Sequence, residues 1–177
     1  IGFFALGGRI YYENNILNKR TSQKEGEKSR VEWEKKYKKY EGKAQPRIVA
    51  INVDMNIFPK TYAFNSSATY KMINKTDEAI DSLFVNHNSY PSTFEFNKPN
   101  TLVSEDTIHN FDIYHLEKPL QPGDSLELKF TIKNKPSTFF RKNSPVRKNG
   151  TFMNNGIYPS FGYTSGGELT DNKTRKK

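Results

Sequence analysis

The residues best suited to chemistry in this chain are three histidines, His87, His109 and His115. Imidazole binds metals, but a zinc site needs several ligands that converge on one point. His87 is expected at the end of one strand, and His109 and His115 at the two ends of a later one. No His-Glu-x-x-His helix is present, and the chain has no cysteine. We therefore interpret the histidines as scattered surface or edge residues and predict no metal ligand.

Other catalytic patterns are absent from the sequence. Ser165-Gly166-Gly167 lacks the pattern and the context of a phosphate-binding loop, and no Gly-x-Ser-x-Gly nucleophile elbow occurs. Glu117 and Asp124 bracket an expected hairpin, where carboxylates ordinarily stabilise turns. We predict that this chain has no catalytic, cofactor-binding or metal-binding residue and is not itself an enzyme. The enzymatic alternative is a metal hydrolase that uses the histidines.

Charge is distributed unevenly along the 177 residues, which carry a formal net charge of +9. Basic residues concentrate at 19–47, 133–148 and 173–177. Such clusters suit nucleic acid or an anionic membrane surface, and the aromatic residues within 139–148 suit stacking on single-stranded nucleic acid. The ordinary interpretation is a solvated helix, loop and tail, because the intervening segments are not basic. Nucleic acid is therefore not an expected partner.

Asparagine occurs in four Asn-x-Ser/Thr sequons, at Asn65, Asn74, Asn149 and Asn172. Such sequons arise easily in a chain rich in Asn, Ser and Thr. They matter for glycosylation only in a protein of the eukaryotic secretory pathway.

An alternation of apolar and polar residues runs from Pro46 to Asn134 and predicts antiparallel strands. The odd positions from Val49 to Ile57 are apolar, and after the next turn the apolar residues stand at the even positions 62, 64, 68, 70 and 72. We expect both sets to be buried, because a one-residue slip would turn them to water. Further strands are expected at 79–86, 92–96, 101–103, 108–116 and 126–132. This pattern predicts a mainly β fold, an antiparallel β-sandwich of about seven or more strands.

One charged amphipathic helix is expected before the sandwich, over 21–43 within a segment bounded at 19–45. Thr21 or Ser22 can cap its start with Glu25 close behind, and Lys/Glu pairs at helical spacing support it. A narrow aromatic stripe on this helix is predicted to dock on the sandwich or on a neighbouring domain: Trp33, Tyr37 and Tyr40.

The periodicity ends after Asn134, where aromatic residues lie among Pro, Gly and Asn. We interpret 135–164 as a long aromatic loop that lies on the sandwich, so that the sandwich domain occupies 46–164. The rings of this loop are predicted to form a domain-contact surface: Phe139, Phe140, Phe152, Tyr158, Phe161 and Tyr163. Residues 165–177 are polar and are expected to form an unanchored tail or a linker to a further domain.

The first eight residues are apolar and uncharged, and Arg9 and Tyr11 begin a basic and aromatic flank typical of a membrane interface. Eight residues cannot span a bilayer, which needs about 20. We interpret residues 1–18 as the end of a transmembrane segment with a juxtamembrane stretch. The alternative is a short buried strand. Because the first residue is Ile and not Met, we expect a cut or processed chain.

The order of these segments resembles that of a known family. IGFFALGGRIYYENNILN precedes EGEKSRVEWEKKYKKYEGKAQPRI, and VDMNIFPKTYAFNSSATYKMINKT and IDSLFVNHN follow, before LQPGDSLELKFTI and NGTFMNNGIYPSFGY. Together they resemble the extracytoplasmic region of bacterial ABC-type transporter permeases fused to a gluzincin aminopeptidase-like module (peptidase family M one). Within that module the resemblance is to the N-terminal, saddle-like β-sandwich, and it covers about Ile1 to Tyr163.

The resemblance implies a non-catalytic scaffold for a peptidase-like module. The family's zinc helix and its Gly-x-Met-Glu-Asn substrate loop belong to a later domain and do not occur here, so no catalytic or zinc residue is carried over. It implies no cofactor in this chain and zinc in a downstream domain. The implied partners are the remainder of the polypeptide, with its peptidase-like domain and transmembrane helices, and a nearby membrane surface. The implied location is the extracytoplasmic (periplasmic) side of the cell membrane.

A second function, from a different class, is an independent adhesion or ligand-binding β-sandwich tethered at the cell surface. Its basic aromatic loop would be the binding face. This alternative predicts that the chain binds an anionic glycan or lipid with a steep dependence on salt.

Overall fold

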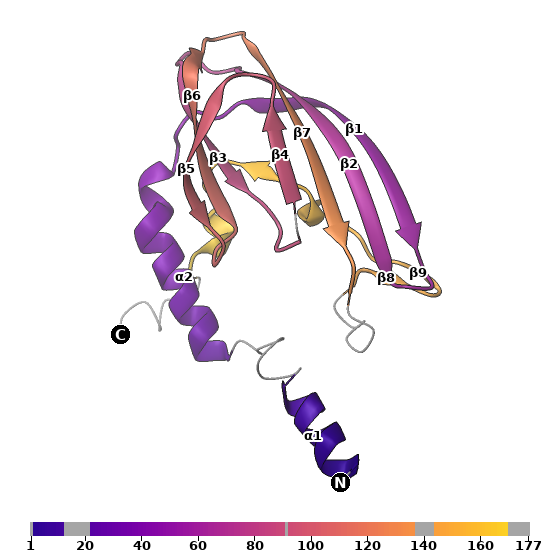
Figure 1. The fold of residues 1–177 in the computed structure, drawn as a ribbon. Coiled ribbons are helices and arrows are strands. Elements are labelled where there is room, and N and C mark those ends of the chain that lie inside the picture. Colours follow the sequence, from indigo (N-terminus) through magenta and orange to yellow (C-terminus); the bar gives the residue numbers. More distant parts are fainter. Residues whose placement is uncertain (1, 13–21, 91, 137–143, 170–177) are drawn as a thin grey trace. The chain divides into compact units, whose positions relative to one another are not determined.

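The computed structural model describes residues 2–12, 22–90, 92–136 and 144–169. The chain divides into two units, which we call the sandwich unit (Tyr40–Tyr163) and the helical unit (Ile1–Lys39 with Thr164–Lys177). Ten strands in three sheets make up the β structure of the described residues (Figure 1). Every strand pair is antiparallel, which confirms the predicted mainly β fold class.

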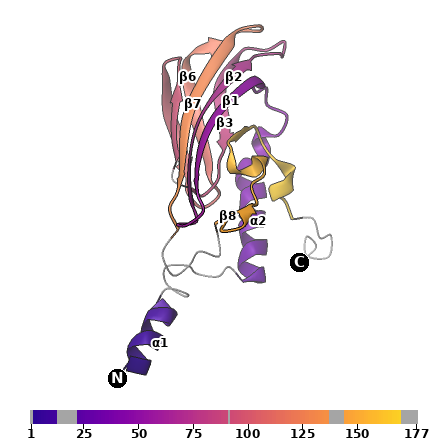
Figure 2. The same cartoon turned by 90° about the vertical axis from the view of Figure 1, so that its right-hand side faces the viewer.

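Two four-stranded sheets face each other in the sandwich unit (Figures 1 and 2). The first sheet has the order β1 (Arg47–Phe58), β2 (Ala63–Ile73), β7 (Ser125–Asn134) and β4 (Ser92–Phe96). The second has the order β10 (Ser160–Phe161), β3 (Ile80–Asn86), β6 (Phe111–Leu120) and β5 (Asn100–Asp106). A short ribbon pairs β8 (Val146–Arg147) with β9 (Gly150–Thr151).

The core lies between the inner faces of these sheets and follows the predicted alternation of β2 and β7. Ala68 pairs with Phe130 and Tyr70 with Leu128, so the even-numbered residues of both strands share the inner face. The second sheet covers this face with apolar residues of β3 and β6. The buried residues that these four strands contribute to the core cluster are Phe64, Ala68, Tyr70, Met72, Leu126, Leu128, Phe130, Ile132, Ile80, Leu83, Leu116 and Leu120.

The expected burial of the first strand is wrong. Its odd positions from Ile51 to Ile57 lie on the inner face, because they pair with the even positions of β2. They are nevertheless half-buried or exposed, and Ile51 is 56% exposed. The physical reason is position: β1 is an edge strand, and none of its residues belongs to the buried core. Alternation therefore predicted which face each residue occupies but not whether another layer covers that face.

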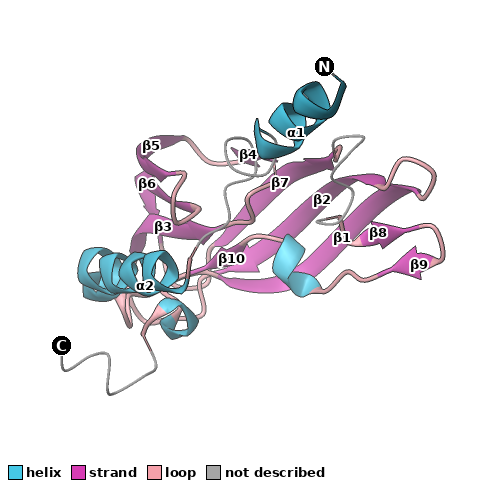
Figure 3. Cartoon of the chain, turned by 90° about the horizontal axis from the view of Figure 1, so that it is seen from below, coloured by secondary structure: helices cyan, strands magenta, loops and turns pink. Residues whose placement is uncertain are grey.

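The aromatic region after Asn134 is partly built into the sandwich. Its β10 pairs with β3, and the short 3-10 helix η4 (Asn155–Ile157) precedes it (Figure 3). The Tyr70 hydroxyl donates to the Pro159 carbonyl at 3.3 Å, and the Gly162 amide donates to the Phe84 carbonyl at 2.8 Å. Residues 144–163 therefore supply structure to the sandwich unit.

The helical unit contains α1 (Gly2–Tyr12) and α2 (Gln23–Tyr37). Ser22 caps α2: its hydroxyl accepts from the Glu25 amide, and the Glu25 carboxylate accepts from the Ser22 amide, which is the capping box that the sequence predicts. A 3-10 turn, η2 (Lys38–Tyr40), follows, so the helix ends earlier than expected. Among the described residues, no helix is long and apolar enough to cross a membrane.

Candidate functional site

A pocket of about 440 Å³ opens on the inner side of the second sheet and is the strongest candidate site. Three strand ends position its charged groups: His87 follows β3, Glu105 lies near the end of β5, and Asp112 lies near the start of β6. Glu105 and Asp112 are paired across β5 and β6, and directly paired residues project to the same face of a sheet. Phe94 and Tyr114 add aromatic walls.

His87 is held by an acceptor at each ring nitrogen. Its Nδ1 lies 2.9 Å from the Asn88 carbonyl, which can only accept, and its Nε2 lies 3.3 Å from Oδ2 of Asp112. A neutral imidazole carries one N–H, so both contacts are satisfied only by the imidazolium. The hydrogen bond to Asp112 raises the pKa of His87 most, the Asn88 carbonyl raises it further, and burial opposes both. The geometry thus favours a charged His87.

Asp112 is the least satisfied polar group of the pocket. The residue is 5% exposed, and its Oδ1 has no hydrogen-bond partner among the described residues. Glu105, its neighbour across the strands, is exposed. Burial raises the pKa of Tyr114 most, and the carboxylates of Asp112 and Glu105 raise it further, to about 12. Tyr114 therefore stays a neutral phenol that can donate a hydrogen bond.

The other two histidines do not join this site. His109 lies in the turn between β5 and β6, where its Nδ1 is 3.0 Å from Oδ2 of Asp106. Oδ1 of Asp106 accepts from the Ile108 and His109 amides, so this carboxylate organises the turn. His115 is an exposed residue within β6. In the described part of the chain, no three His, Asp or Glu side chains converge closely enough to hold a metal ion.

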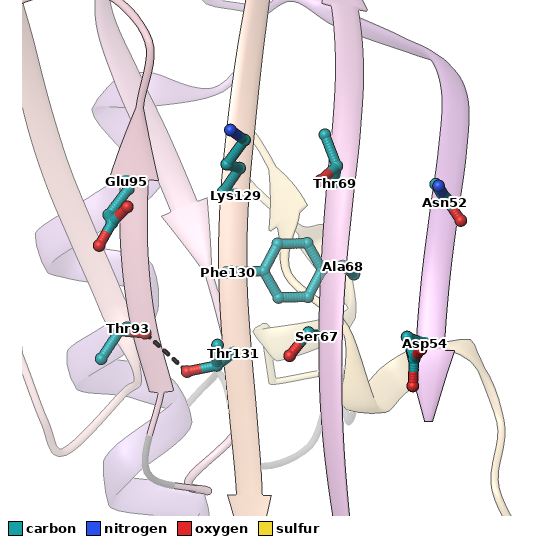
Figure 4. Close-up of a pocket in the computed structure, with 10 residues that line it drawn as sticks. All are labelled: Asn52, Asp54, Ser67, Ala68, Thr69, Thr93, Glu95, Lys129, Phe130 and Thr131. Carbon is teal, nitrogen blue, oxygen red and sulfur yellow. Dashed lines mark hydrogen bonds between the residues drawn. The ribbon is translucent and has the colours of Figure 1, made fainter. Parts of the chain in front are cut away.

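A second hollow, of about 420 Å³, lies on the outer face of the first sheet and is lined mostly by residues with polar side chains. Figure 4 shows the side chains in two rows across the strands. One row ends in a hydrogen bond of 2.7 Å between the hydroxyls of Thr93 and Thr131. Hydroxyl and charged groups on the outer face are typical of a solvated antiparallel sheet, and they form no cluster suited to catalysis.

A third feature is the apolar inner face of β1, which we call the β1 stripe. It consists of Ile51, Val53, Met55 and Ile57, at alternate positions of one strand. Ile51, Val53 and Ile57 are 56%, 38% and 40% exposed. Within the described part of the chain, no strand pairs with the outer edge of β1. The stripe therefore combines exposed apolar side chains with unpaired backbone groups.

The aromatic residues of the predicted helix stripe divide between the two units. Trp33 and Tyr37 are buried, and their ring centroids are 4.8 Å apart. In the helical unit, the 3-10 turn η5 (Ser165–Gly167) approaches Trp33 so closely that a Cβ on Gly167 would lie 2.6 Å from the indole nitrogen. Tyr40 belongs to the sandwich unit, where its ring centroid lies 4.5 Å from that of Phe84. The predicted domain-docking role of these residues stays a prediction.

The start of the expected C-terminal tail contacts α2. Lys38 forms an ion pair of 3.3 Å with Glu168, and this contact raises the pKa of Lys38. Leu169 is buried. Residues 164–169 are thus anchored within the helical unit.

The predicted contact surface of the aromatic loop is placed only in part. Phe139 and Phe140 lie outside the described residues. Phe152 is 73% exposed. Tyr158, Phe161 and Tyr163 are half-buried, and the first two pack against the core. Their role in domain contact stays a prediction.

Sequence reasoning missed Glu105 and Asp112. Each is an acidic residue in a strand, and no motif marks it. The one available signal was a carboxylate at an inner, apolar position of β6, in line with Tyr114 and Leu116. Recognising it required the register that only strand pairing supplies.

The fold buries the asparagine of one sequon, Asn74. Its side-chain nitrogen donates to the carbonyls of Glu78 at 2.7 Å and Leu120 at 2.8 Å. Its oxygen accepts from the amide and the hydroxyl of Thr76. The Asn74 amide is therefore a structural link between the β2–β3 turn and β6. Asn65 and Asn149 are exposed, and Asn172 lies outside the described residues.

Comparison with known proteins gives matches among solved structures only. No family model matches the chain, and no curated protein matches its sequence. One similar structure is the M1 zinc metallopeptidase from Deinococcus radiodurans, at 13% identity over 54% of this chain and 22% of that chain, with a TM-score of 0.42. A mutant M1 zinc metallopeptidase from the same organism, bound to a Tyr-Ser-Ala substrate, matches at 12% identity over 54% of this chain and 21% of that one, with a TM-score of 0.41.

A mutant two-domain M1 zinc metallopeptidase bound to L-tryptophan matches at 12% identity over 53% of this chain and 22% of that one, with a TM-score of 0.41. This chain thus spans about a fifth of the length of these three proteins. They belong to the peptidase class that the sequence resemblance names, and none of the three is described as a transporter permease. TM-scores below 0.5 do not establish a common fold, so the likeness assigns this chain no activity.

Proposed function

We propose that this chain is a non-catalytic β-sandwich domain that acts as a scaffold for a peptidase-like module on the same polypeptide. The observation that carries the proposal is the β1 stripe, which we assign as the surface that the module covers. The sequence resemblance supports the identity of the module. The same resemblance supports placing the domain in a membrane-anchored transporter permease, on the extracytoplasmic side.

The unpaired edge of β1 supports the need for a cover. β1 is 12 residues long, and edge strands of this kind are normally blunted by shortness, charge or proline. Only Asp54 is charged within 48–58, and no proline interrupts the strand. A long apolar edge invites aggregation unless another element covers it. A docked module would remove that liability.

The energy available at the stripe favours a partner on the same polypeptide. Complete burial of an Ile or Val side chain stabilises by about 1.5–3 kcal/mol. Ile51, Val53 and Ile57 are roughly half exposed, so covering them contributes about 1 kcal/mol each, about 3 kcal/mol in all. Association of free molecules costs about 4–15 kcal/mol in lost motion, which exceeds this gain. A covalently connected module avoids most of that cost.

The proposal is tested by amide hydrogen exchange of β1 in two proteins, this chain alone and the complete polypeptide. Amides of β1 whose N–H groups face away from β2 should exchange fast in the isolated chain and at least tenfold more slowly in the complete polypeptide. The control is β5, an edge strand of the second sheet, because interior strands such as β7 are paired on both sides. Equal exchange of β1 in both proteins would show that nothing covers it.

A variant pair separates the stripe from the rest of β1. Replacing Ile51 and Val53 by Ser should weaken docking of the module and increase exchange in β1. Replacing Asn52 and Asp54 by Ser changes the outer face of the same strand and should leave docking intact. If the isolated chain instead forms a dimer by sedimentation and the Ile51/Val53 variant is monomeric, a second copy covers the stripe and the scaffold proposal fails.

A further inference from the structure

We propose that the pocket formed by His87, Glu105 and Asp112 binds an organic cation, a primary ammonium or guanidinium group carried on a short apolar stem. This inference is independent of the scaffold role, because the pocket lies between the second sheet and β4, whereas the β1 stripe lies at the opposite edge of the first sheet. Three observations carry it: an unsatisfied buried acceptor, an excess of negative charge, and the size and lining of the pocket.

The first observation is Oδ1 of Asp112. The side chain of Asp112 is 8% exposed, and its two carboxylate oxygens differ in their hydrogen-bond partners. Oδ2 lies 3.3 Å from Nε2 of His87, whereas Oδ1 has no donor within the described residues. Leaving a buried acceptor unpaired costs about 1–3 kcal/mol, and more when the group is charged. Because Oδ1 itself has almost no accessible surface, a ligand N–H would reach it only after the carboxylate turns toward the pocket, and that contact would recover the energy.

The second observation is the charge of the lining. Among the described residues that line the pocket, Glu105 and Asp112 are acidic and His87 can carry a positive charge, so this lining has a net charge of −1 when His87 is protonated. Neither Lys nor Arg is among the lining residues. The chain as a whole carries +9, so this pocket is an anionic site on a basic protein. A ligand with a single positive charge neutralises it.

The third observation concerns the shape and chemistry of the walls. A volume of about 440 Å³ falls in the range of small-molecule pockets, about 300–1,000 Å³. Phe94, Leu102 and Tyr114 provide apolar surface for a stem, and aromatic faces attract a cation directly. A calcium ion instead requires six to eight oxygen ligands, and the two carboxylates of the pocket supply only a part of that coordination shell. The lining therefore fits an alkylated cation better than a bare metal ion.

The test is an NMR titration of the isotopically labelled 177-residue chain at constant ionic strength. The probes are n-butylammonium chloride and n-butylguanidinium chloride, with n-butanol as the neutral analogue of the same stem. We expect both cations to shift the amide resonances of Glu105 and Asp112 saturably, with a Kd in the millimolar range. The neutral analogue should shift them at least tenfold less.

Variants locate the binding. Glu105→Gln removes an exposed carboxylate from the pocket and should weaken cation binding about tenfold without disturbing the fold. Asp112→Asn should abolish it. Glu117→Gln is the matched control, because Glu117 is an exposed acid of β6 that does not line the pocket. Equal weakening by Glu105→Gln and Glu117→Gln would overturn the proposal, since it would show only general attraction to an acidic surface.

Further arms identify the source of the cation. Tighter binding of N-acetyl-lysine methylamide or N-acetyl-arginine methylamide than of the butyl probes would point to a side chain of a protein ligand. The opposite order would point to a free amine, and both orders support the pocket. Saturable shifts with calcium chloride and none with butylammonium would overturn the proposal in favour of a metal site. The proposal would also be overturned if neither cation reached saturation at about 100 mM, a concentration about 100-fold above a Kd of 1 mM.

Discussion

Adding one methyl group at Gly167 should detach the C-terminal segment of the helical unit from Trp33. A Cβ at this position would lie 2.6 Å from Nε1, 2.8 Å from Cδ1 and 3.1 Å from Cε2 of the indole ring. The ring has little room to yield, because Trp33 is 6% exposed and packs against Tyr37, which is 1% exposed. The backbone of 165–167 must therefore move instead.

The size of the effect follows from the overlap. Forcing an extra methyl group into a packed contact typically costs about 1–3 kcal/mol. That cost lowers the equilibrium constant for docking of residues 164–169 by roughly 5- to 150-fold, since about 1.4 kcal/mol corresponds to a factor of ten. The buried side chain of Leu169 and the ion pair between Lys38 and Glu168 would be released together with the turn.

Fluorescence reports this change directly, because Trp33 is the single tryptophan of the chain. Gly167→Ala should shift its emission to longer wavelength and increase acrylamide quenching, and amide exchange should rise across 164–169. The matched control is Gly166→Ala, whose Cβ would meet only the Thr164 methyl group at 3.6 Å, an ordinary contact. Identical emission, quenching and exchange in the two variants would refute the packing argument.

Three further predictions concern the sandwich unit. Leu128→Ala removes a fully buried core side chain and should lower the free energy of unfolding, measured by denaturant titration, by about 2–5 kcal/mol. Ile51→Ala, on the exposed stripe, should lower it by less than about 1 kcal/mol. Comparable losses in the two variants would place Ile51 in the core. Asn74→Ala should lower the free energy of unfolding by about 1–3 kcal/mol, because it removes the donor from the Glu78 and Leu120 carbonyls. The control Asn65→Ala, at an exposed position, should leave it nearly unchanged. An unchanged free energy of unfolding in Asn74→Ala would contradict these two hydrogen bonds. The pKa of His87, followed by NMR, should fall in Asp112→Asn. Because folding raises this pKa, protonation of His87 stabilises the fold fully below the ordinary value of about 6.5 and stops doing so as the pH rises through the folded-state pKa; a stability profile unchanged in His87→Gln would count against this linkage.

Local patterns of the sequence predicted much of the secondary structure. The strands at 47–58 and 92–96 have the bounds that alternation predicts, and Ser22 with Glu25 forms the predicted capping box. These features depend on residues close together in the chain, so a single sequence contains the information for them. The region after Asn134 was harder, because β10 is two residues long and exists only through its pairing with β3. No local pattern marks such a strand.

The candidate pocket was beyond sequence reasoning for a related reason. Its charged groups come from three strand ends, and neither Glu105 nor Asp112 stands out by type or spacing. The unsatisfied state of Oδ1 of Asp112 depends on where every neighbouring donor lies. His87 was identified as a chemically capable residue, but its partner was not. Partner choice is a property of the register between β3 and β6, not of either strand alone.

The sequence by itself determined the alternation of β1 and β2, because the identity of a side chain and the two-residue period of a strand decide which residues share a face. Only the tertiary structure decided that the shared face is core at Ala68 and open at its cross-strand partner Val53. The physical reason is that burial belongs to a pair of layers. A strand's own residues specify an apolar face, whereas the extent of the opposite sheet decides how far along the first sheet that face is removed from water.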